Sequence, residues 1–477
     1  MLSNSSSKTG FSLELQPAQA WTAILGLILF TALCVFVGAG SLLRLAFPVG
    51  CLAVALFLYR QYPILYIGFS WWVSFLTPWL RRVIDYRSGW DPNPVILLAP
   101  YLVMLVTFIT FVRYLPRSYR EGGLPFILAI LGVFYGGLVG LIQAPPVGVV
   151  RALLDWLTPI LFGFHLFMNW RDYPSYRQNL QRIFLWGVLV MGTYGVVQYL
   201  VAPEWDRQWL LNTKLTSMGD PKPLGLRVWS TLNSVGPFSA VIMAGLLLLF
   251  SSQGALRFPA AAVGYLSFLL SQSRTGWHGW LLALSLIISS VKARLQMRLI
   301  ITVIVVALCV VPLTTVEPFS KIINNRVQTL SNLENDNSAQ VRQQIYKDSL
   351  GEAFSNGLGK GIGNIWAINA QGKLEAAVID SGIIEIFSTL GWLGAIPYVS
   401  GLFLIFFNLF QSSEGRFDIF ANTARAIGVS CFAQLVSGSA QIGIAGVILW
   451  GFLGISMAAN KYYQHQRIIT FTGRSNT

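Results

Sequence analysis

The chain has 477 residues, of which 54% are hydrophobic and only 11% are charged, and its mean hydropathy is +0.60. Soluble domains carry about 25% charged residues, so this composition excludes an ordinary soluble protein and indicates a polytopic membrane protein. The net charge of +14 does not indicate nucleic-acid binding, because the positive residues are scattered singly among the loops and do not cluster on one soluble face.

Apolar windows recur along the chain with lengths near twenty residues, which is about what a helix needs to cross roughly 30 Å of hydrocarbon. Their centres lie near residues 30, 50, 72, 102, 134, 159, 192, 241, 264, 284, 306, 398, 430 and 449. The alternating pattern of a membrane β-barrel is missing. We therefore predict an all-α fold, a polytopic bundle of about 12 to 14 transmembrane helices with a long, partly helical loop on the outer face.

The expected organisation is a polar N-terminal tail, a bundle of about eleven helices, a large polar loop, the C-terminal membrane helices and a polar C-terminal tail. In chain order these segments are residues 1–19, 20–316, 317–380, 381–460 and 461–477. A second polar segment, residues 203–229, interrupts the first bundle. Loops of that length in compact proteins usually carry function or are disordered. We expect this loop to be ordered, because it contains a helical pattern, and therefore to be functional.

Lys and Arg side chains favour the cytoplasmic side of a membrane. If the N-terminus is cytoplasmic and the chain crosses fourteen times, the inner loops collect most of the positive residues and the short outer loops collect far fewer. The outer set is Arg44, Arg81, Arg82, Arg87, Arg151 and Arg274. We therefore expect both termini in the cytoplasm of a bacterial cell, an inner-membrane location, and both long polar segments on the periplasmic face.

The long loop contains "SAQVRQQIYKDSLGEAF" (338–354), which predicts an amphipathic helix with Ser338 as its N-cap. The glycine-rich stretch "NGLGKGIGN" (356–364) follows it. This stretch lacks the GxxxxGK[ST] spacing of a nucleotide-binding loop. Its glycines either form a structural turn that ends the preceding helix or let the backbone approach a phosphate or an ion closely.

Arginines dominate the candidate site residues, because guanidinium groups bind phosphate oxygens bidentately and stay charged. On the outer face, Arg227, Arg274 and Arg342 are the main candidates, with Arg326 and Arg151 as secondary ones. Structural roles remain open for several arginines. Arg151 is four residues from Asp155 and suits an ion pair with it, and the group Arg81, Arg82 and Arg87 suits contact with lipid headgroups.

The histidines and cysteines do not indicate a metal site. His278 follows Arg274 by four residues and could act as a general base, bind a sugar or bond to a neighbouring helix. His165 suits a hydrogen bond between two helices. The cysteines lack metal-ligand spacing and are expected to be buried small hydrophobic residues: Cys34, Cys51, Cys309 and Cys431. We expect neither a metal nor a cofactor.

Three pieces of the sequence resemble the superfamily of O-antigen ligases and Wzy-type O-antigen polymerases, which are membrane enzymes of bacterial surface polysaccharides. "RVWSTLNSVGPFSA" (227–240) is similar to the family's arginine followed by a polar turn into a helix. "SQSRTGWHGWLLAL" (271–284) is similar to its Ser-Arg-small hairpin. The third piece joins the long loop, with its glycine-rich stretch, to "DSGIIEIFSTLGWLG" (380–394), and resembles the family's periplasmic loop and its return to the membrane.

The resemblance implies a glycosyltransferase that transfers or polymerises a glycan carried on undecaprenyl pyrophosphate, at the periplasmic face and without a metal. It implies that Arg227, Arg274 and Arg342 gather around the pyrophosphate. The expected partners are the lipid-linked oligosaccharide, a glycan acceptor and membrane lipid, with a chain-length regulator as a further candidate and no nucleic acid.

The chain departs from the family pattern at two places. Ligases carry a His-Asn pair where this chain has Asp380 and Ser381, which favours a polymerase-like member over a lipid A core ligase. The family's Pro-Asn after the first arginine is replaced by Val235 and Gly236. Asp380 becomes the first candidate for activation of the acceptor, with a helix N-cap as its structural alternative, and Glu385 and His278 follow it.

A transporter of a lipid-linked glycan, or of a small anion such as bicarbonate, is the alternative function. Transporters usually contain internal repeats and charged residues near the midplane of the membrane. This sequence has no repeat, and its charges group at the outer edge of the membrane and in the long loop, which favours the enzyme. A structural membrane scaffold is a third alternative, and it explains the long polar loop least well.

Overall fold

The computed structural model describes residues 17–290, 296–297, 300–301, 351, 357–364, 366–368, 374–376, 381–412, 415 and 418–474. Within these residues the fold is helical apart from the connecting loops, an isolated β-bridge between Gly219 and Leu226, and one short antiparallel hairpin. The hairpin pairs β1 (Trp366–Ile368) with β2 (Leu374–Ala376). The all-α prediction is therefore confirmed for the architecture of the chain.

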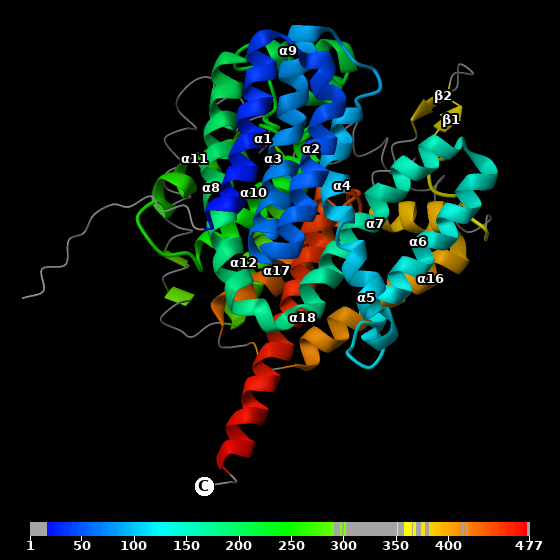
Figure 1. Cartoon of the computed structure of the whole chain (residues 1–477), viewed down its shortest axis with the longest axis vertical. Coiled ribbons are helices and arrows are strands. Elements are labelled where there is room, and N and C mark those ends of the chain that lie inside the picture. The colour runs from blue at the N-terminus through cyan, green and yellow to red at the C-terminus, as the bar shows by residue number, and fades with distance from the viewer. Residues whose placement is uncertain are drawn as a thin grey trace, which may run out of the picture.

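The first part of the chain forms a series of helices joined by short turns (Figure 1). In order these are α1 (Ala18–Val37), α2 (Gly40–Gln61), α3 (Pro63–Ser88), η1 (Val95–Leu98), α4 (Ala99–Leu105), α5 (Phe108–Ser118), α6 (Leu124–Gln143), α7 (Pro146–Met168), η2 (Trp170–Asp172) and α8 (Tyr173–Val201). The connections are short, and η1, α4 and α5 together form one continuous segment, Val95–Ser118, that is long enough to cross a membrane.

The second part begins with a polar loop and continues with shorter helices. In order these are α9 (Glu204–Thr213), η3 (Thr216–Met218), α10 (Val235–Leu249), α11 (Arg257–Leu270), α12 (Arg274–Ser290), α16 (Gly382–Gln411), α17 (Ile419–Gln434) and α18 (Gly443–Arg474). The predicted amphipathic helix at 338–354 lies almost entirely outside the described residues. Helix α18 continues through most of the segment that we predicted to be a polar tail.

The predicted apolar windows agree with the helices. Every window centre lies in a described helix except the one near residue 306, which is outside the described residues. Eight helical segments are long and apolar enough to cross a membrane, and α10 and α11 are shorter apolar helices. These segments identify a multi-pass membrane protein. They do not establish the predicted count of 12 to 14 spans, because six α-helices in the described part do not meet the length or hydropathy of a span: α3, α9, α10, α11, α12 and α17.

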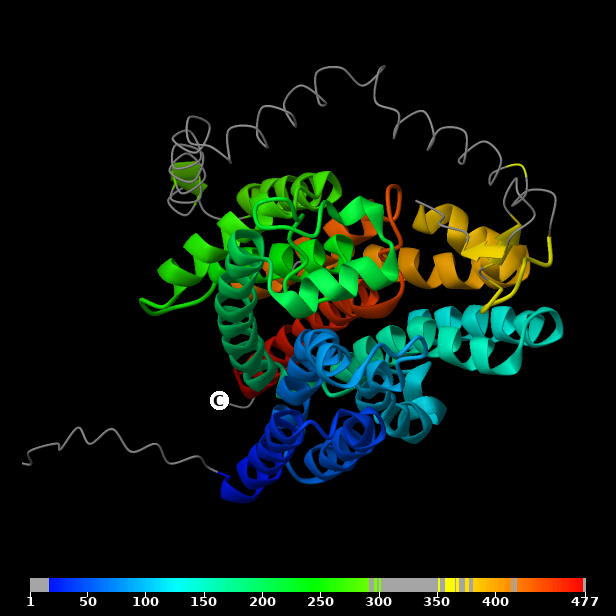
Figure 2. The same cartoon turned by 90° about the horizontal axis from the view of Figure 1, so that it is seen from above.

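Helix α18 lies at the centre of the bundle and packs along α7 (Figures 1 and 2). The two backbones meet where Gly163 of α7 faces Trp450 and Gly454 of α18, because a Cβ atom at either glycine would collide with the opposite backbone. Small residues permit this close approach between membrane helices, where lipid offers no hydrophobic drive for association. Trp71 of α3 and Phe184 of α8 complete an aromatic core beside these helices.

The glycine-rich stretch packs between helices α6 and α16. Residues 357–364 form a turn in which the N–H of Ile362 donates to the carbonyl of Gly136 in α6, and the N–H groups of Lys360 and Gly361 donate to Ser388 and Thr389 in α16. Gly361 has a φ of 78°, and a Cβ there would collide with the backbone of α6. Next to the turn, α16 breaks at Gly391, whose φ is 61°. The structure thus shows a packing role for this stretch, and the helix that it was predicted to end lies almost entirely outside the described residues.

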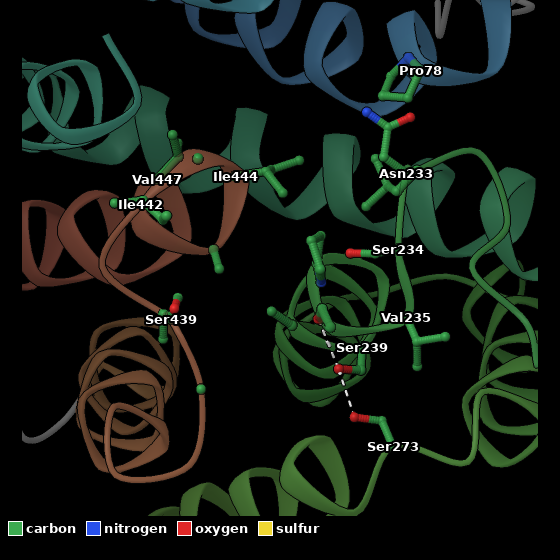
Figure 3. Close-up of a pocket in the computed structure, with 18 of the residues that line it drawn as sticks. Pro78, Asn233, Ser234, Val235, Ser239, Ser273, Ser439, Ile442, Ile444 and Val447 are labelled. Atoms are coloured by element: carbon green, nitrogen blue, oxygen red, sulfur yellow. Dashed lines mark hydrogen bonds between the residues drawn. The ribbon is translucent and has the colours of Figure 1, made fainter. Parts of the chain in front are cut away.

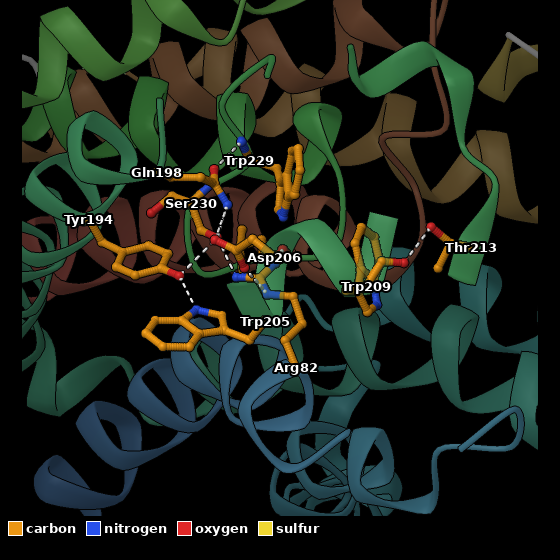
Figure 4. Close-up of polar contacts among 10 residues, drawn as sticks. Arg82, Tyr194, Gln198, Trp205, Asp206, Trp209, Thr213, Trp229 and Ser230 are labelled. Atoms are coloured by element: carbon orange, nitrogen blue, oxygen red, sulfur yellow. Dashed lines mark hydrogen bonds and ion pairs between the residues drawn. The ribbon is translucent and has the colours of Figure 1, made fainter. Parts of the chain in front are cut away.

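A buried ion pair fixes the polar loop between α8 and α10 (Figure 4). Arg82 of α3 and Asp206 of α9 are both 0% exposed, and Arg82 Nε lies 2.8 Å from Asp206 Oδ1. The same guanidinium donates to the carbonyls of Ser230 and Leu232. Gln198 of α8 donates to Asp206 and accepts from the N–H of Ser230 at 2.8 Å. The loop is therefore held from two helices just before α10 begins.

The burial of Arg82 corrects the expectation that Arg81, Arg82 and Arg87 contact lipid headgroups. Arg81 is also buried and pairs with Asp85 at 3.1 Å. Arg87 is exposed, and it donates to the carbonyl of Val35 at the end of α1. The first two arginines turn inward because carboxylates and loop carbonyls brought by the fold satisfy them there. A sequence pattern of three neighbouring arginines carries no sign of those partners.

Two other predictions are confirmed by contacts. Thr110 Oγ1 lies 2.7 Å from His165 Nδ1, so His165 makes the expected bond between α5 and α7. Cys34, Cys51 and Cys431 are buried, as expected of small hydrophobic residues, and Cys309 lies outside the described residues.

Candidate functional site

A cavity of about 1250 Å³ lies at the end of the bundle where α7, α10, α12 and α18 begin. Figure 3 shows two facing walls, one with Asn233, Ser234 and Ser273 and the other with Ser439 and the start of α18. Parts of α3 and α4 also line it. We call this end of the bundle the cavity side. It is also the side of the loop between α8 and α10, so polar segments from distant parts of the sequence meet there.

The turn at residues 271–276 shapes one wall. Ser273 precedes α12, and its hydroxyl accepts from the N–H of Gly276 at 3.2 Å, as an N-cap does. The same hydroxyl donates to Ser239 of α10 at 3.0 Å (Figure 3). Gln272 adopts a φ of 54°, which turns the chain sharply into the helix. These contacts place Arg274 at the first position of α12, in the lining of the cavity.

Arg227 reaches this turn from the polar loop. Its guanidinium donates to the carbonyls of Ser217, Ser271 and Gln272 at 2.8 Å, 3.3 Å and 3.2 Å. The side chain lines the cavity and ties the loop to the turn that carries Arg274. The structure thus brings two of the predicted arginines to one wall, and it gives Arg227 a structural contribution that the sequence did not reveal.

The electrostatics of this wall favour an anion. Helices α10 and α12 both begin there, so the positive ends of their dipoles face the cavity. Arg274 places a cation at the positive end of α12, which disfavours the isolated helix by about 0.3–1 kcal/mol. A bound anion reverses that cost, because it interacts favourably with both the guanidinium and the helix end.

The opposite region of the cavity carries a carboxylate that the sequence analysis did not place in the site. Asp155 of α7 lines the cavity, and its Oδ1 accepts a hydrogen bond from the hydroxyl of Tyr101 in α4. Arg151, one turn earlier in α7, is exposed and also lines the cavity. We expected Arg151 to form an ion pair with Asp155, but among the described residues the bonded partner of this carboxylate is Tyr101.

Glu385 lies behind the cavity wall, in the first turn of α16. Its Oε2 accepts from the hydroxyl of Ser439 and from Gln441 Nε2, the latter at 2.7 Å. Ser439 lines the cavity, whereas Glu385 itself is not part of the lining. Glu385 and Asp155 are close enough to interact electrostatically. Among the residues predicted to activate the acceptor, Glu385 is therefore connected to the cavity through its hydrogen bond with Ser439.

The remaining predicted site residues are elsewhere. His278 is exposed on α12 and is not part of the lining of the cavity. Arg342, Arg326 and Asp380 lie outside the described residues. Helix α16 has Ser381 as its N-cap, with the hydroxyl accepting from the N–H of Ile384 at 3.5 Å. The N-cap role that we considered for Asp380 belongs to its neighbour.

Sequence reasoning missed Tyr101, Asp155, Asn233, Ser439 and Gln441. The stretch "SGSAQIG" (437–443) could have drawn attention, because it places polar and small residues between two apolar windows. Asn233 lies two residues before the position where the family's Pro-Asn is replaced, and it contributes an amide to the cavity in the same turn. Within the described part of the chain, no group of three or more His, Cys, Asp or Glu residues could hold a metal ion.

Residues 259–399 match the model of a protein family described as O-antigen ligase. The match confirms the resemblance to the superfamily of O-antigen ligases and polymerases, and it indicates a glycosyltransferase-like activity on lipid-linked glycans. It includes Arg274 and Glu385, whereas Arg227 and Arg151 precede it. No curated protein and no solved structure matches the chain.

Proposed function

We propose that the protein is an integral membrane glycosyltransferase that transfers or polymerises a glycan carried on undecaprenyl pyrophosphate, for a surface polysaccharide or an exopolysaccharide. The observation that carries the proposal is the cavity wall where Arg227, Arg274 and the beginnings of α10 and α12 converge. Stabilising the departing diphosphate is the main electrostatic demand of this reaction.

In the proposed mechanism the diphosphate lies against Arg274 and the helix ends. Arg227 holds the turn that carries Arg274 and contributes its own charge. Arg342, from the long loop, is a third ligand in the proposal, and Arg326 and Arg151 are secondary ones. The acceptor hydroxyl attacks the anomeric carbon, the bond from that carbon to the phosphate oxygen breaks, and its electron pair leaves on the lipid diphosphate.

A carboxylate takes the proton from the acceptor hydroxyl. Asp380 remains the first candidate for this role, since it immediately precedes the N-cap of α16. Glu385 is the second, because its hydrogen bond to Ser439 connects it to the cavity. His278 is the third candidate, and its exposed position on α12 makes it the least favoured of the three.

The cavity side is periplasmic in this proposal, and both termini are cytoplasmic. The distribution of charge supports this orientation. At the opposite ends of the helices lie Arg60, Arg117, Arg171, Arg257 and Lys461, and positive residues favour the cytoplasmic side. On the cavity side, Arg81 and Arg82 are buried in ion pairs, and Arg227 and Arg274 line the cavity.

The test is to incubate the purified protein in lipid nanodiscs with undecaprenyl pyrophosphate-linked oligosaccharide alone. A ladder of longer chains would identify a polymerase, which the Asp-Ser pair at 380–381 favours, and a requirement for a separate acceptor would identify a ligase. Arg274→Ala should lower the rate by at least 10²-fold, because it removes a charge that stabilises the departing diphosphate.

The matched control is Glu204→Gln. Glu204 pairs with Arg207 on the exposed surface of α9, away from the cavity, so this variant should keep the wild-type rate. A parallel assay in proteoliposomes separates the enzyme from a transporter. If labelled glycan crossed the membrane without being joined to any acceptor, the proposed function would be wrong.

A further inference from the structure

The cavity has two chemically different regions. One wall is cationic, with Arg227 and Arg274. The other region is built by α4, α7 and the start of α18, and its charged groups are Asp155 and, one turn earlier in α7, Arg151. Glycosyl transfer brings together two substrates, an anionic donor and a polyhydroxylated acceptor, and the cationic wall serves the donor. The carboxylate in the second region therefore needs its own explanation.

Asp155 is held in a defined position at this second region. The hydroxyl of Tyr101 in α4 donates to its Oδ1, and this bond fixes the carboxylate relative to the tyrosine ring. The beginning of α18 packs directly against the pair, since a Cβ atom at Gly443 would lie 3.8 Å from Asp155 Oδ1 and 3.9 Å from the Tyr101 hydroxyl. Gly443 is the first residue of α18, so the positive end of that helix lies beside the carboxyl group.

The second oxygen of Asp155 has capacity for a ligand. Among the residues that the structure describes, Oδ2 has no hydrogen-bond donor, although the side chain lines the cavity. An ionised carboxylate only accepts hydrogen bonds, and hydroxyl donors to it form the short, strong, charge-assisted kind. Ser439, also in the lining, adds a second polar group to the cavity. A sugar presents hydroxyl donors for such a group, whereas a diphosphate would be repelled by it.

We propose that Asp155, positioned by Tyr101, binds hydroxyl groups of the acceptor sugar and thereby sets which acceptor enters the cavity. The inference rests on the proposed function and adds an acceptor subsite to it. Asp155 holds the acceptor, and removal of the proton stays with the carboxylates at or near the start of α16. Asp155 also links α7 to α4 through Tyr101. The variants must therefore distinguish a loss of acceptor binding from a loss of helix packing.

The experiment measures the two substrates separately on the full-length protein. The donor probe is undecaprenyl pyrophosphate without sugar, titrated by native mass spectrometry. The acceptor probe is the free oligosaccharide released from the lipid by mild acid, titrated by saturation-transfer NMR. Asp155→Asn should weaken binding of the free oligosaccharide about tenfold and change binding of the lipid diphosphate less than twofold. Arg274→Ala should weaken binding of the lipid diphosphate by more than tenfold and change binding of the free oligosaccharide less than twofold.

Two further variants address packing. An asparagine at position 155 can still accept from Tyr101, so the melting temperature of Asp155→Asn should stay within about 2 °C of the wild type. Asp155→Glu keeps the charge and should recover part of the affinity for the oligosaccharide. Tyr101→Phe removes the positioning hydrogen bond and should weaken oligosaccharide binding less than Asp155→Asn does.

The outcomes distinguish this proposal from the function on which it rests. If Asp155→Asn bound the oligosaccharide as tightly as the wild type, or if the wild type did not bind it, the acceptor subsite would be wrong, whatever Arg274→Ala did to the donor. Equal losses of both probes, together with a lower melting temperature, would assign Asp155 a packing role only. Unchanged binding of the lipid diphosphate in Arg274→Ala would contradict the donor site and leave the result for Asp155 standing.

Discussion

Two arginine clusters on the cavity side of the bundle have opposite characters. Arg82 is fully buried, bonded to Asp206 and to two loop carbonyls, and it holds the polar loop in place. Arg274 lines a cavity at the positive end of a helix, where its charge disfavours the protein alone. The first lies in a fully buried cluster, and the second is half-buried beside a cavity where two helix ends favour an anion. Burial separates a structural arginine from one that can reach a ligand.

The comparison predicts that replacing each arginine by leucine has different consequences. Arg82→Leu should lower the free energy of unfolding by about 3–5 kcal/mol, because it leaves the charge of Asp206 buried and unpaired. Arg274→Leu should cost less stability than Arg82→Leu, because Arg274 is only half-buried, while abolishing binding of the lipid diphosphate. Thermal unfolding in detergent measures the first effect and donor titration the second. Equal losses of stability in the two variants would remove the distinction.

The next largest effect concerns the glycine-rich stretch, which packs between helices and has no residue in the cavity lining. Gly361→Ala should cost about 2–4 kcal/mol, since the residue has a positive φ and its Cβ would collide with Gly140. Gly357→Ala is the matched control, because a Cβ there meets nothing within 4 Å. If Gly361→Ala kept its melting temperature but lost donor binding, the packing role would be wrong and the stretch would belong to the ligand-binding site.

Arg274→Lys tests whether the anion site depends on the geometry of the guanidinium group or on its charge alone. The ammonium keeps the charge but loses the planar pair of donors that binds two phosphate oxygens at once. We expect donor affinity to fall about tenfold, or about 1.4 kcal/mol, which is less than the loss in Arg274→Ala. The titration with undecaprenyl pyrophosphate measures it. Wild-type affinity in the lysine variant would mean that charge alone, and not bidentate geometry, accounts for the site.

The smallest effect is expected at the opposite end of the bundle, where Asp418 caps α17 and accepts from Tyr173 and Tyr463. Burial by itself would raise the pKa of Asp418, but these hydrogen bonds and the nearby Arg177 outweigh it and hold the pKa below its usual value. Asp418→Asn should cost about 1 kcal/mol.

The sign of the pH dependence follows from the lowered pKa of Asp418. Its contribution is fully present above the unfolded pKa, near 4, and is lost as the pH falls through the lower folded pKa. Melting temperatures of the wild type and Asp418→Asn should therefore converge below about pH 4. A difference between them that grew as the pH fell would contradict this assignment.

The residues show why part of the site could be predicted and part could not. Arg274 was found because its motif, "SQSRTG", is contiguous and lies between two apolar windows. Arg227 was found in the same way, but its bonds to Ser271 and Gln272 join positions more than forty residues apart. Asp155 was assigned to a local partner, Arg151, since a partner four residues away is the one that a helical sequence makes visible.

The sequence by itself determined the membrane class of the protein, the positions of its helices and the arginine at the start of α12, because length, apolarity and capping are local properties. Only the tertiary structure decided which arginines are buried, what the glycines pack against and which carboxylate faces the cavity. These properties depend on pairs such as Arg82 with Asp206 and Tyr101 with Asp155, which lie 124 and 54 residues apart in the chain. In a bundle, the packing of distant helices sets the partners of each polar group and, through them, its role.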